Sequence, residues 1–165
     1  MIVKEIMTKN VITCQPHSSI REAARLMYLN GLTGLPVLDV NDEVVGIITE
    51  QDLVKLEQPI HIPSIVGILG SALYLDNPLN GDEIEKQLAV LSATTVEQIM
   101  TQKVVTIAPD ASLEDLAELF LSKKINPIPV VETGKLVGIV SRADIVKMLA
   151  GDKDLGKAEW GLVKK

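Results

Sequence analysis

Apolar and polar positions along the first third of the chain alternate in an order that predicts a strand, a helix, a hairpin and a second helix. After a short apolar run, the segment from Ile20 places apolar residues three or four positions apart, which is the spacing of one helix face. Two further apolar runs enclose a polar stretch with hairpin-turn chemistry. The predicted elements are strands at 11–13, 35–38 and 44–48 and helices at 20–29 and 50–56.

The ends of these helices carry recognisable chemistry. Ser19 precedes the first helix as an N-cap, because its hydroxyl can accept a hydrogen bond from the first turn. Asn30-Gly31 is expected to end that helix in the left-handed conformation. Thr49 is placed to cap the second helix.

The second half of the chain repeats the first. The segment Ile6-Met7-Thr8 returns as Ile99-Met100-Thr101, 93 positions later, and the offset falls to 92 where Gly46 returns as Gly138. A strand glycine at both positions permits the close approach of a backbone or a ligand. Self-similarity at a fixed offset indicates two copies of one unit, related by a pseudo-twofold axis. The second set of predicted elements is strands at 104–107, 128–131 and 136–140 and helices at 113–122 and 142–149.

Alternating strands and helices predict an α/β (α+β) fold made of two β-α-β-β-α repeats. Repeats of roughly 55 residues are marginally stable alone, so the two should pack as one module. Within the segment between them, 82–91 has helical spacing with an acidic first turn, and 65–75 is a weaker helix candidate. The expected divisions are a first repeat at 1–57, a helical insert at 58–95, a second repeat at 96–150 and a charged tail at 151–165.

Composition narrows the choice of partners and compartment. The net charge of −6 opposes attraction to nucleic-acid phosphates. The single Cys14 cannot form an internal disulfide, which favours a reducing, cytoplasmic compartment. The N-terminus lacks the basic and apolar regions of a secretion signal. The apolar stretch at 62–75 is 14 residues long, whereas a bilayer span needs about 20. We therefore expect neither nucleic-acid nor membrane partners.

The matched segments resemble a pair of CBS domains, the nucleotide-sensing module named after cystathionine β-synthase. The resemblance rests on four motifs that occur in both halves in the same order: Ile-Met-Thr, Val-x-Thr, a Pro-Val strand, and Gly-Ile-x-Thr/Ser-x-x-Asp. It implies repeats that fold head to tail around two clefts, and two modules that join as a disc-shaped homodimer. It also implies binding of adenosine compounds such as AMP, ADP, ATP or S-adenosylmethionine.

The last of these motifs carries the candidate binding chemistry. Thr49 and Ser141 stand where strands end and helices begin, so their hydroxyls and the nearby N–H groups are placed to meet a phosphate. The carboxylates of Asp52 and Asp144, three positions later, suit the two hydroxyls of a ribose. The alternative is that both pairs are only capping boxes. Their recurrence in two matching repeats favours the binding role.

The resemblance implies that each cleft draws on both repeats. Backbone groups of an edge strand would contact the adenine, apolar side chains would enclose it, and the aspartate would hold the ribose. Thr13 and Thr106 are equally well explained as ordinary strand threonines. Cleft A would combine Thr13, Thr33, Gly34 and Leu35 with Ser141, Arg142 and Asp144. Cleft B would combine Thr106, Asn126, Pro127 and Ile128 with Thr49 and Asp52.

The two predicted clefts differ in charge. Arg142 follows Ser141, whereas Glu50 follows Thr49, so a cation in cleft A corresponds to an anion in cleft B. If both side chains face their clefts, ADP or ATP should prefer cleft A, and cleft B should take AMP or stay empty. The alternative for Arg142 is a solvated position on its helix.

No catalytic constellation emerges from the sequence. Neither His17 nor His61 has a Cys, Ser or second His at ligand or triad spacing, so we expect no enzyme, no metal and no catalytic cofactor. The leading interpretation is a regulatory module for energy sensing that binds AMP, ADP or ATP and passes the occupancy to an unidentified protein. The alternatives are a structural dimerisation module with degenerate clefts and a sensor of S-adenosylmethionine or a cyclic dinucleotide.

A homodimer is expected because the predicted helices carry apolar faces that one module leaves partly uncovered. The alternative is that these faces pack on their own sheets. The residues concerned are Ile20, Ala23 and Met27 in one helix and Leu113, Ala117 and Phe120 in the other.

Overall fold

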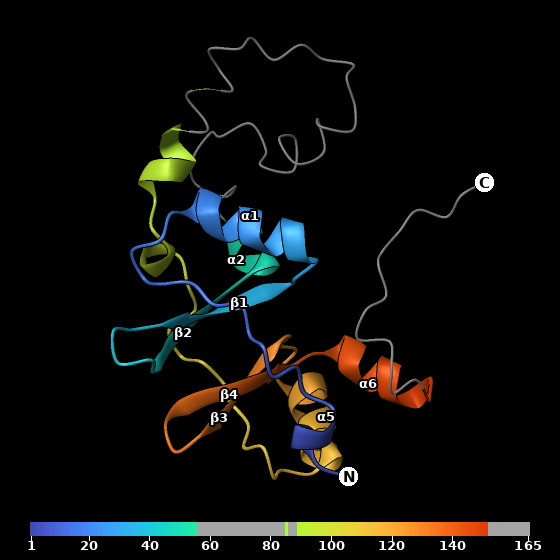
Figure 1. The fold of residues 1–165 in the computed structure, drawn as a ribbon. Helices are drawn as coiled ribbons and strands as arrows, with labels where there is room; N and C mark the ends of the chain where they lie inside the picture. Colours follow the sequence, from blue (N-terminus) through green and yellow to red (C-terminus); the bar gives the residue numbers. More distant parts are fainter. Residues whose placement is uncertain (56–84, 86–88, 152–165) are drawn as a thin grey trace, which may run out of the picture. The chain divides into compact units, whose positions relative to one another are not determined.

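The computed structural model describes residues 1–55, 85 and 89–151, and its chain divides into two compact units (Figure 1). The first-repeat unit comprises the described residues of 12–105 together with 133–136. The second-repeat unit comprises 1–11, 106–132 and the described residues of 137–165. Each unit mixes helices with a short antiparallel hairpin, which confirms the predicted α/β (α+β) class. The candidate helix at 65–75, most of that at 82–91 and nearly all of the tail lie outside the described residues.

The first-repeat unit is built on a hairpin whose strands and flanking helices share one core. Ser19 caps α1 by accepting a hydrogen bond from the Glu22 N–H at 3.2 Å. Gly31 ends the helix at φ 60°, a conformation that glycine adopts without strain. Both helix ends are those predicted from the sequence. The elements are α1 (Ile20–Asn30), β1 (Gly34–Leu38), β2 (Val44–Thr49), α2 (Glu50–Lys55) and the 3-10 turn Val96–Gln98.

The second-repeat unit follows the same plan, except that the turn of its hairpin and the start of β4, residues 133–136, are grouped with the first-repeat unit. Ser112 caps α5, because its hydroxyl oxygen accepts a hydrogen bond from Asp115 N at 3.1 Å. Thr133 and Gly134 join the hairpin strands at φ 48° and 82°, the positive values that a two-residue turn of matching twist requires. The elements are the 3-10 turn Val3–Glu5, α5 (Leu113–Ser122), β3 (Ile128–Glu132), β4 (Lys135–Val140) and α6 (Arg142–Leu149).

The predicted strands at 11–13 and 104–107 are not strands; a single bridging residue occurs just after the first range, at Cys14, and at the end of the second, at Ile107. Cys14 pairs in parallel with Val37, donating to Pro36 O at 3.1 Å and accepting from Leu38 N at 3.0 Å. The next rungs of this ladder would need the N–H of Pro16 on one side and of Pro36 on the other. Proline has no N–H, so the pairing stops after one residue. Ile107 makes the equivalent single bridge to Val130 between Pro109 and Pro129.

The N-terminal segment packs within the second-repeat unit. Val3 N donates to Ala111 O at 3.0 Å, which ties the first 3-10 turn to the start of α5. Thr8 and Ile139 exchange two backbone hydrogen bonds, both of 2.9 Å, at β4. Val3 is fully buried in the core of this unit. Residues that open the first repeat in the sequence therefore complete the unit that contains the second.

The start of the second repeat makes the corresponding contacts in the first-repeat unit. Val96 N donates to Ser18 O at 2.8 Å, and Thr101 exchanges backbone hydrogen bonds of 2.9 and 3.0 Å with Ile47 of β2. Val96, like Val3, is fully buried. The two compact units have thus exchanged the opening segments of the two repeats.

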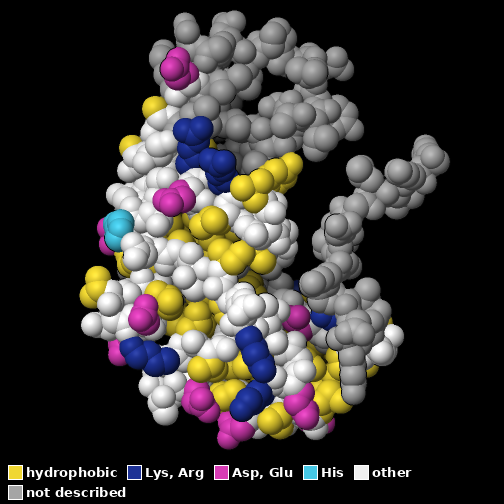
Figure 2. Space-filling model, in the orientation of Figure 1, with side chains coloured by type: hydrophobic (Ala, Val, Ile, Leu, Met, Phe, Trp, Pro, Cys, Tyr) yellow, Lys and Arg dark blue, Asp and Glu magenta, His cyan; other side chains and the backbone are white. Residues whose placement is uncertain are grey.

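The helix faces proposed for dimerisation are largely covered by their own units, as the alternative expected, so they give little support to a dimer. Amphipathic spacing reveals an apolar face but does not say what covers it. Other hydrophobic side chains are exposed, among them Leu29 of α1 and Leu149 of α6, and such side chains appear at several places on the face in Figure 2. In the first-repeat unit the buried residues are Ile20, Ala23 and Met27. In the second-repeat unit Phe120 is buried, Leu113 packs partly buried against the same core, and Ala117 is half-buried.

Cys14 is predicted to be unreactive in the folded protein. Burial, with a smaller contribution from the charge of Glu22, raises the pKa of its thiol from 9.0 to about 11. The unfolded thiol ionises first, so this group's contribution to stability is present below pH 9 and is lost as the pH rises toward 11. At pH 8 we expect a thiol reagent to label the chain in urea within minutes and the native chain only as fast as it unfolds. Fast labelling of the native chain would contradict this burial.

Candidate functional site

In the first-repeat unit the predicted site residues meet where the hairpin ends and α2 begins. Gly34 faces Thr49 across the strand pair, and Thr33 O accepts a hydrogen bond from Glu50 N at 3.1 Å. Leu35 lies next in β1 and is fully buried. This unit thus brings Thr33, Gly34 and Leu35 together with Thr49 and Asp52. Thr13 is half-buried in the same unit, next to the bridging Cys14.

Asp52 is the one charged side chain that is buried among the described residues, with 4% of its surface exposed. Its Oδ2 accepts hydrogen bonds from Thr49 N and Thr49 Oγ1, both at 2.9 Å. Its Oδ1 accepts one from Thr101 Oγ1 at 3.2 Å and lies 3.5 Å from the largely exposed Lys55 Nζ. The two oxygens of a carboxylate accept about four hydrogen bonds in all. This carboxylate is therefore fully engaged by its own chain.

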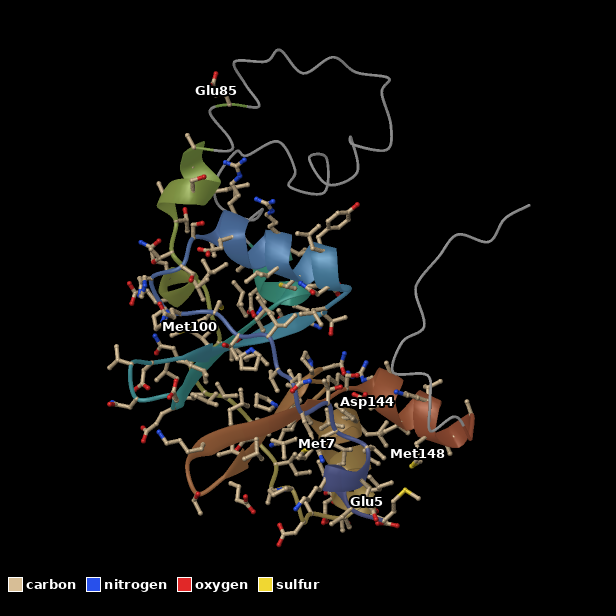
Figure 3. The ribbon with its side chains drawn as sticks, in the orientation of Figure 1. Glu5, Met7, Glu85, Met100, Asp144 and Met148 are labelled. Atoms are coloured by element: carbon tan, nitrogen blue, oxygen red, sulfur yellow. The ribbon has the colours of Figure 1, made fainter. Side chains whose placement is uncertain are left out.

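Asp144 has the same local contact but an open oxygen. Its Oδ2 accepts hydrogen bonds from Ser141 N at 2.6 Å and from Ser141 Oγ at 2.7 Å. Within the part of the chain that the structure describes, its Oδ1 has no hydrogen-bond or ion-pair partner. The side chain is half-buried at the start of α6 (Figure 3). The capping box of the alternative interpretation is thus present at Ser141 and Asp144, and it leaves Oδ1 of Asp144 unengaged.

In the second-repeat unit the edge of β3 meets the start of α6. Arg142 N donates to Asn126 Oδ1 at 2.9 Å, while Pro127 lies buried just before β3 and Ile128 is buried at its start. This unit brings these residues together with Ser141 and Asp144. Thr106 is exposed beside the bridging Ile107.

The side chain of Arg142 is held by its own unit. One guanidinium nitrogen donates to Phe120 O at 3.4 Å, and the guanidinium carbon lies 6.0 Å from the centre of the Phe120 ring. A cation near the last carbonyls of α5 is favourably placed for that helix dipole. A phosphate would have to compete with these contacts to recruit Arg142. Glu50 is exposed in the first turn of α2.

Methionines occupy the space beside the two motif glycines. A Cβ atom on Gly46 would lie 2.3 Å from Met100 Sδ, and one on Gly138 would lie 2.5 Å from Met7 Sδ. Figure 3 labels both methionines. The predicted close approach at these glycines is therefore made by a side chain of the same unit.

Thr101 is the residue of this arrangement that the motif analysis missed. Its hydroxyl touches Asp52 across a sequence separation of 49 residues. The recurrence of Ile-Met-Thr at both repeat starts was the available signal, but it was used only to align the repeats. The combination of residues from both units in clefts A and B stays a prediction.

The sequence model of the CBS domain matches residues 3–58 and 96–151, and so covers both repeats. The chain belongs to the CBS-domain family. The Methanocaldococcus jannaschii protein MJ1426 is 33% identical over 156 residues, which span 90% of this chain and 91% of that protein. A solved structure of the CBS-pair protein CBSX2 from Arabidopsis thaliana is 27% identical, with a TM-score of 0.68 over 91% of this chain and 94% of that one.

Two related CBS structures contain adenosine compounds. CBSX2 has been solved in complex with AMP, in a structure that is 28% identical to this chain, covers 92% of it and 98% of its own chain, and has a TM-score of 0.67. The CBS domain pair of protein MJ0100 has been solved with 5′-methylthioadenosine and S-adenosyl-L-methionine, at 29% identity, 92% and 97% coverage and a TM-score of 0.64. Adenosine-type ligands thus recur among similar CBS pairs.

Two kinds of feature are absent from the described residues. These residues hold no cluster of three or more His, Cys, Asp or Glu side chains that could bind a metal ion. None of the helices they form is long and apolar enough to cross a membrane.

Proposed function

We propose that this chain is a non-catalytic regulatory module that binds an adenine nucleotide. The binding residues lie where the hairpin of each repeat ends and the next helix begins. The observation that carries the proposal is the half-buried carboxylate of Asp144, held in place by Ser141 with Oδ1 unengaged. One carboxylate can accept hydrogen bonds from both hydroxyls of a ribose. The AMP complex of CBSX2 and the adenosine-type ligands of MJ0100 support this class of ligand.

Replacing Asp144 by alanine is expected to weaken AMP binding about tenfold or more. Loss of hydrogen bonds to a charged group costs about 1.5–3 kcal/mol, which is roughly a factor of 10 to 150 in the dissociation constant. Isothermal titration calorimetry on the full chain measures this directly. The titrations should include ADP, ATP, 5′-methylthioadenosine, S-adenosylmethionine and a cyclic dinucleotide, because the resemblance does not choose among them.

Asp115→Ala is the matched control for this experiment. Asp115 Oδ2 accepts hydrogen bonds from Ser112 N at 3.2 Å and Ser112 Oγ at 2.7 Å, so it forms the same Ser-x-x-Asp contact in the same unit. Its loss should lower stability as a lost helix cap does and leave AMP affinity unchanged. Equal AMP binding by both variants and the parent would reduce Asp144 to a capping residue. A chain that bound none of the ligands would favour the dimerisation module.

Three finer proposals accompany this one. A homodimer is proposed from the family resemblance alone, since the helix faces first suggested for it are largely covered by their own units. A cytoplasmic location is proposed from the single, buried Cys14. Transmission of occupancy to a regulated protein requires that the ligand bind one state of the module better than another.

A further inference from the structure

The residues that surround Asp52 and Asp144 are the same in type but not in arrangement. Thr101 and Thr8 occupy equivalent positions, and each exchanges two backbone hydrogen bonds of 2.9–3.0 Å with the adjacent strand. Lys55 likewise has a counterpart in Lys147. Only Thr101 places its hydroxyl on the aspartate: across the described residues, no hydrogen bond joins Thr8 to Asp144 and no ion pair joins Lys147 to it. Asp52, whose two oxygens are both engaged by the chain, is thus the closed form of this arrangement. Asp144, with one oxygen unengaged by the described residues, is the open form.

The closed form leaves no place on Asp52 for a sugar hydroxyl. Both acceptor positions of Oδ2 are taken by Thr49, and Oδ1 receives the Thr101 hydroxyl and faces Lys55. The Lys55 side chain is 72% exposed, so solvent screens that ion pair and it can yield readily. The Thr101 hydroxyl is fixed more firmly, because the backbone bridge to Ile47 holds its residue against β2. The two hydroxyls of a ribose would need both acceptor positions of Oδ1, because those of Oδ2 are taken, so a ribose can be held there only if Thr101 leaves as well as Lys55.

We propose that Thr101 is an affinity-determining residue that closes the Asp52 site, so that the first equivalent of ligand binds at Asp144 and the Asp52 site fills only as the Thr101 hydroxyl leaves. This inference rests on the proposed function, because it assigns unequal affinities to the same two aspartates. Occupancy at Asp52 then frees the side chain of Thr101, and the preceding residue, Met100, packs against Gly46. Ligand binding at this site is thereby coupled to the opening segment of the second repeat.

The test compares Thr101→Val with Thr8→Val in the full chain, using AMP as the probe in calorimetric titrations. Valine keeps the shape of threonine and replaces its hydroxyl by a methyl group, which cannot donate a hydrogen bond, and both positions have the same backbone bridge. We expect Thr101→Val to tighten the weaker of two AMP sites about tenfold, because a hydrogen bond to a charged group no longer competes. Thr8→Val should leave both sites within twofold of the parent. An unchanged AMP isotherm for Thr101→Val would overturn the proposal.

A measurement without ligand separates this inference from the proposed function. In urea unfolding, Thr101→Val should lower the folding equilibrium constant about tenfold, because it leaves Asp52 short of a partner, whereas Thr8→Val should lower it by less than twofold. Equal stabilities of the two variants would overturn the role of Thr101 whatever AMP does. If AMP bound neither the parent nor the variants, both the proposed function and the competition between AMP and Thr101 for Asp52 would be wrong. Unequal stabilities of the two variants would then support only the hydrogen bond between Thr101 and Asp52.

Discussion

Replacing Leu116 by alanine is expected to lower the free energy of unfolding by about 2–5 kcal/mol, because it removes a large side chain from a closed core. Leu116 is fully buried on α5 and packs with Phe120, Ile128 and Val140. The loss combines the transfer free energy of the removed atoms with the cavity that they leave. Urea unfolding followed by circular dichroism measures the change.

Leu121→Ala is the matched control, because Leu121 lies on the same helix and is 79% exposed. Both substitutions change helix propensity equally, so their difference isolates burial. We expect Leu121→Ala to change the free energy of unfolding by less than about 0.5 kcal/mol. Comparable losses from both substitutions would mean that α5 does not present the Leu116 face to the core.

Alanine at either motif glycine is expected to destabilise its unit by about 1–3 kcal/mol, the usual cost of overpacking. At Gly46 the three atoms nearest to the new Cβ all belong to the Met100 side chain, the nearest at 2.3 Å. At Gly138 it meets Met7 Sδ at 2.5 Å and also the backbone oxygen of Thr8 at 3.1 Å. A flexible side chain can move away more easily than a backbone oxygen, so Gly138→Ala should cost more.

Double variants test this explanation. Met100→Ala should offset most of the cost of Gly46→Ala, because it removes the three atoms nearest to the new Cβ. Met7→Ala should offset only part of the cost of Gly138→Ala, since the contact with Thr8 O remains. Chemical denaturation of the single and double variants gives the coupling energies. Additive losses in both pairs would show that the methionines are not what excludes a side chain at these glycines.

Local chemistry explains why much of the fold could be predicted. The helix from Ile20 is defined by neighbouring residues, a serine cap at its start and a glycine at positive φ after its end. The second hairpin is likewise defined by its two-residue turn. The predicted strand at 11–13 was wrong because the prediction rested on apolar composition, which does not show whether a backbone can form the hydrogen bonds of a ladder. The prolines that flank the pairing, Pro16 and Pro36, lack the N–H groups that a longer ladder needs.

The residues of the candidate site could be predicted from the sequence, but the difference between the surroundings of Asp52 and Asp144 could not. Asp52 and Asp144 lie in matching motifs, so the sequence assigns them the same role. Their difference comes from Thr101, whose hydroxyl reaches Asp52 from a distant part of the chain. Tertiary contacts of this kind leave no periodic pattern. The contact of Arg142 with Phe120 escaped prediction for the same reason.

The exchanged opening segments set an order in which the protein can fold during its synthesis. The first-repeat unit draws its described core from residues up to Met100, so that core can close while the second repeat is still being made. The second-repeat unit needs Val3 and Thr8, which are synthesised more than 100 residues before their partners Ala111 and Ile139. The N-terminal segment must therefore wait, with its apolar side chains unprotected, until the far end of the second repeat has left the ribosome. Chaperones that bind nascent chains would find their target in this segment.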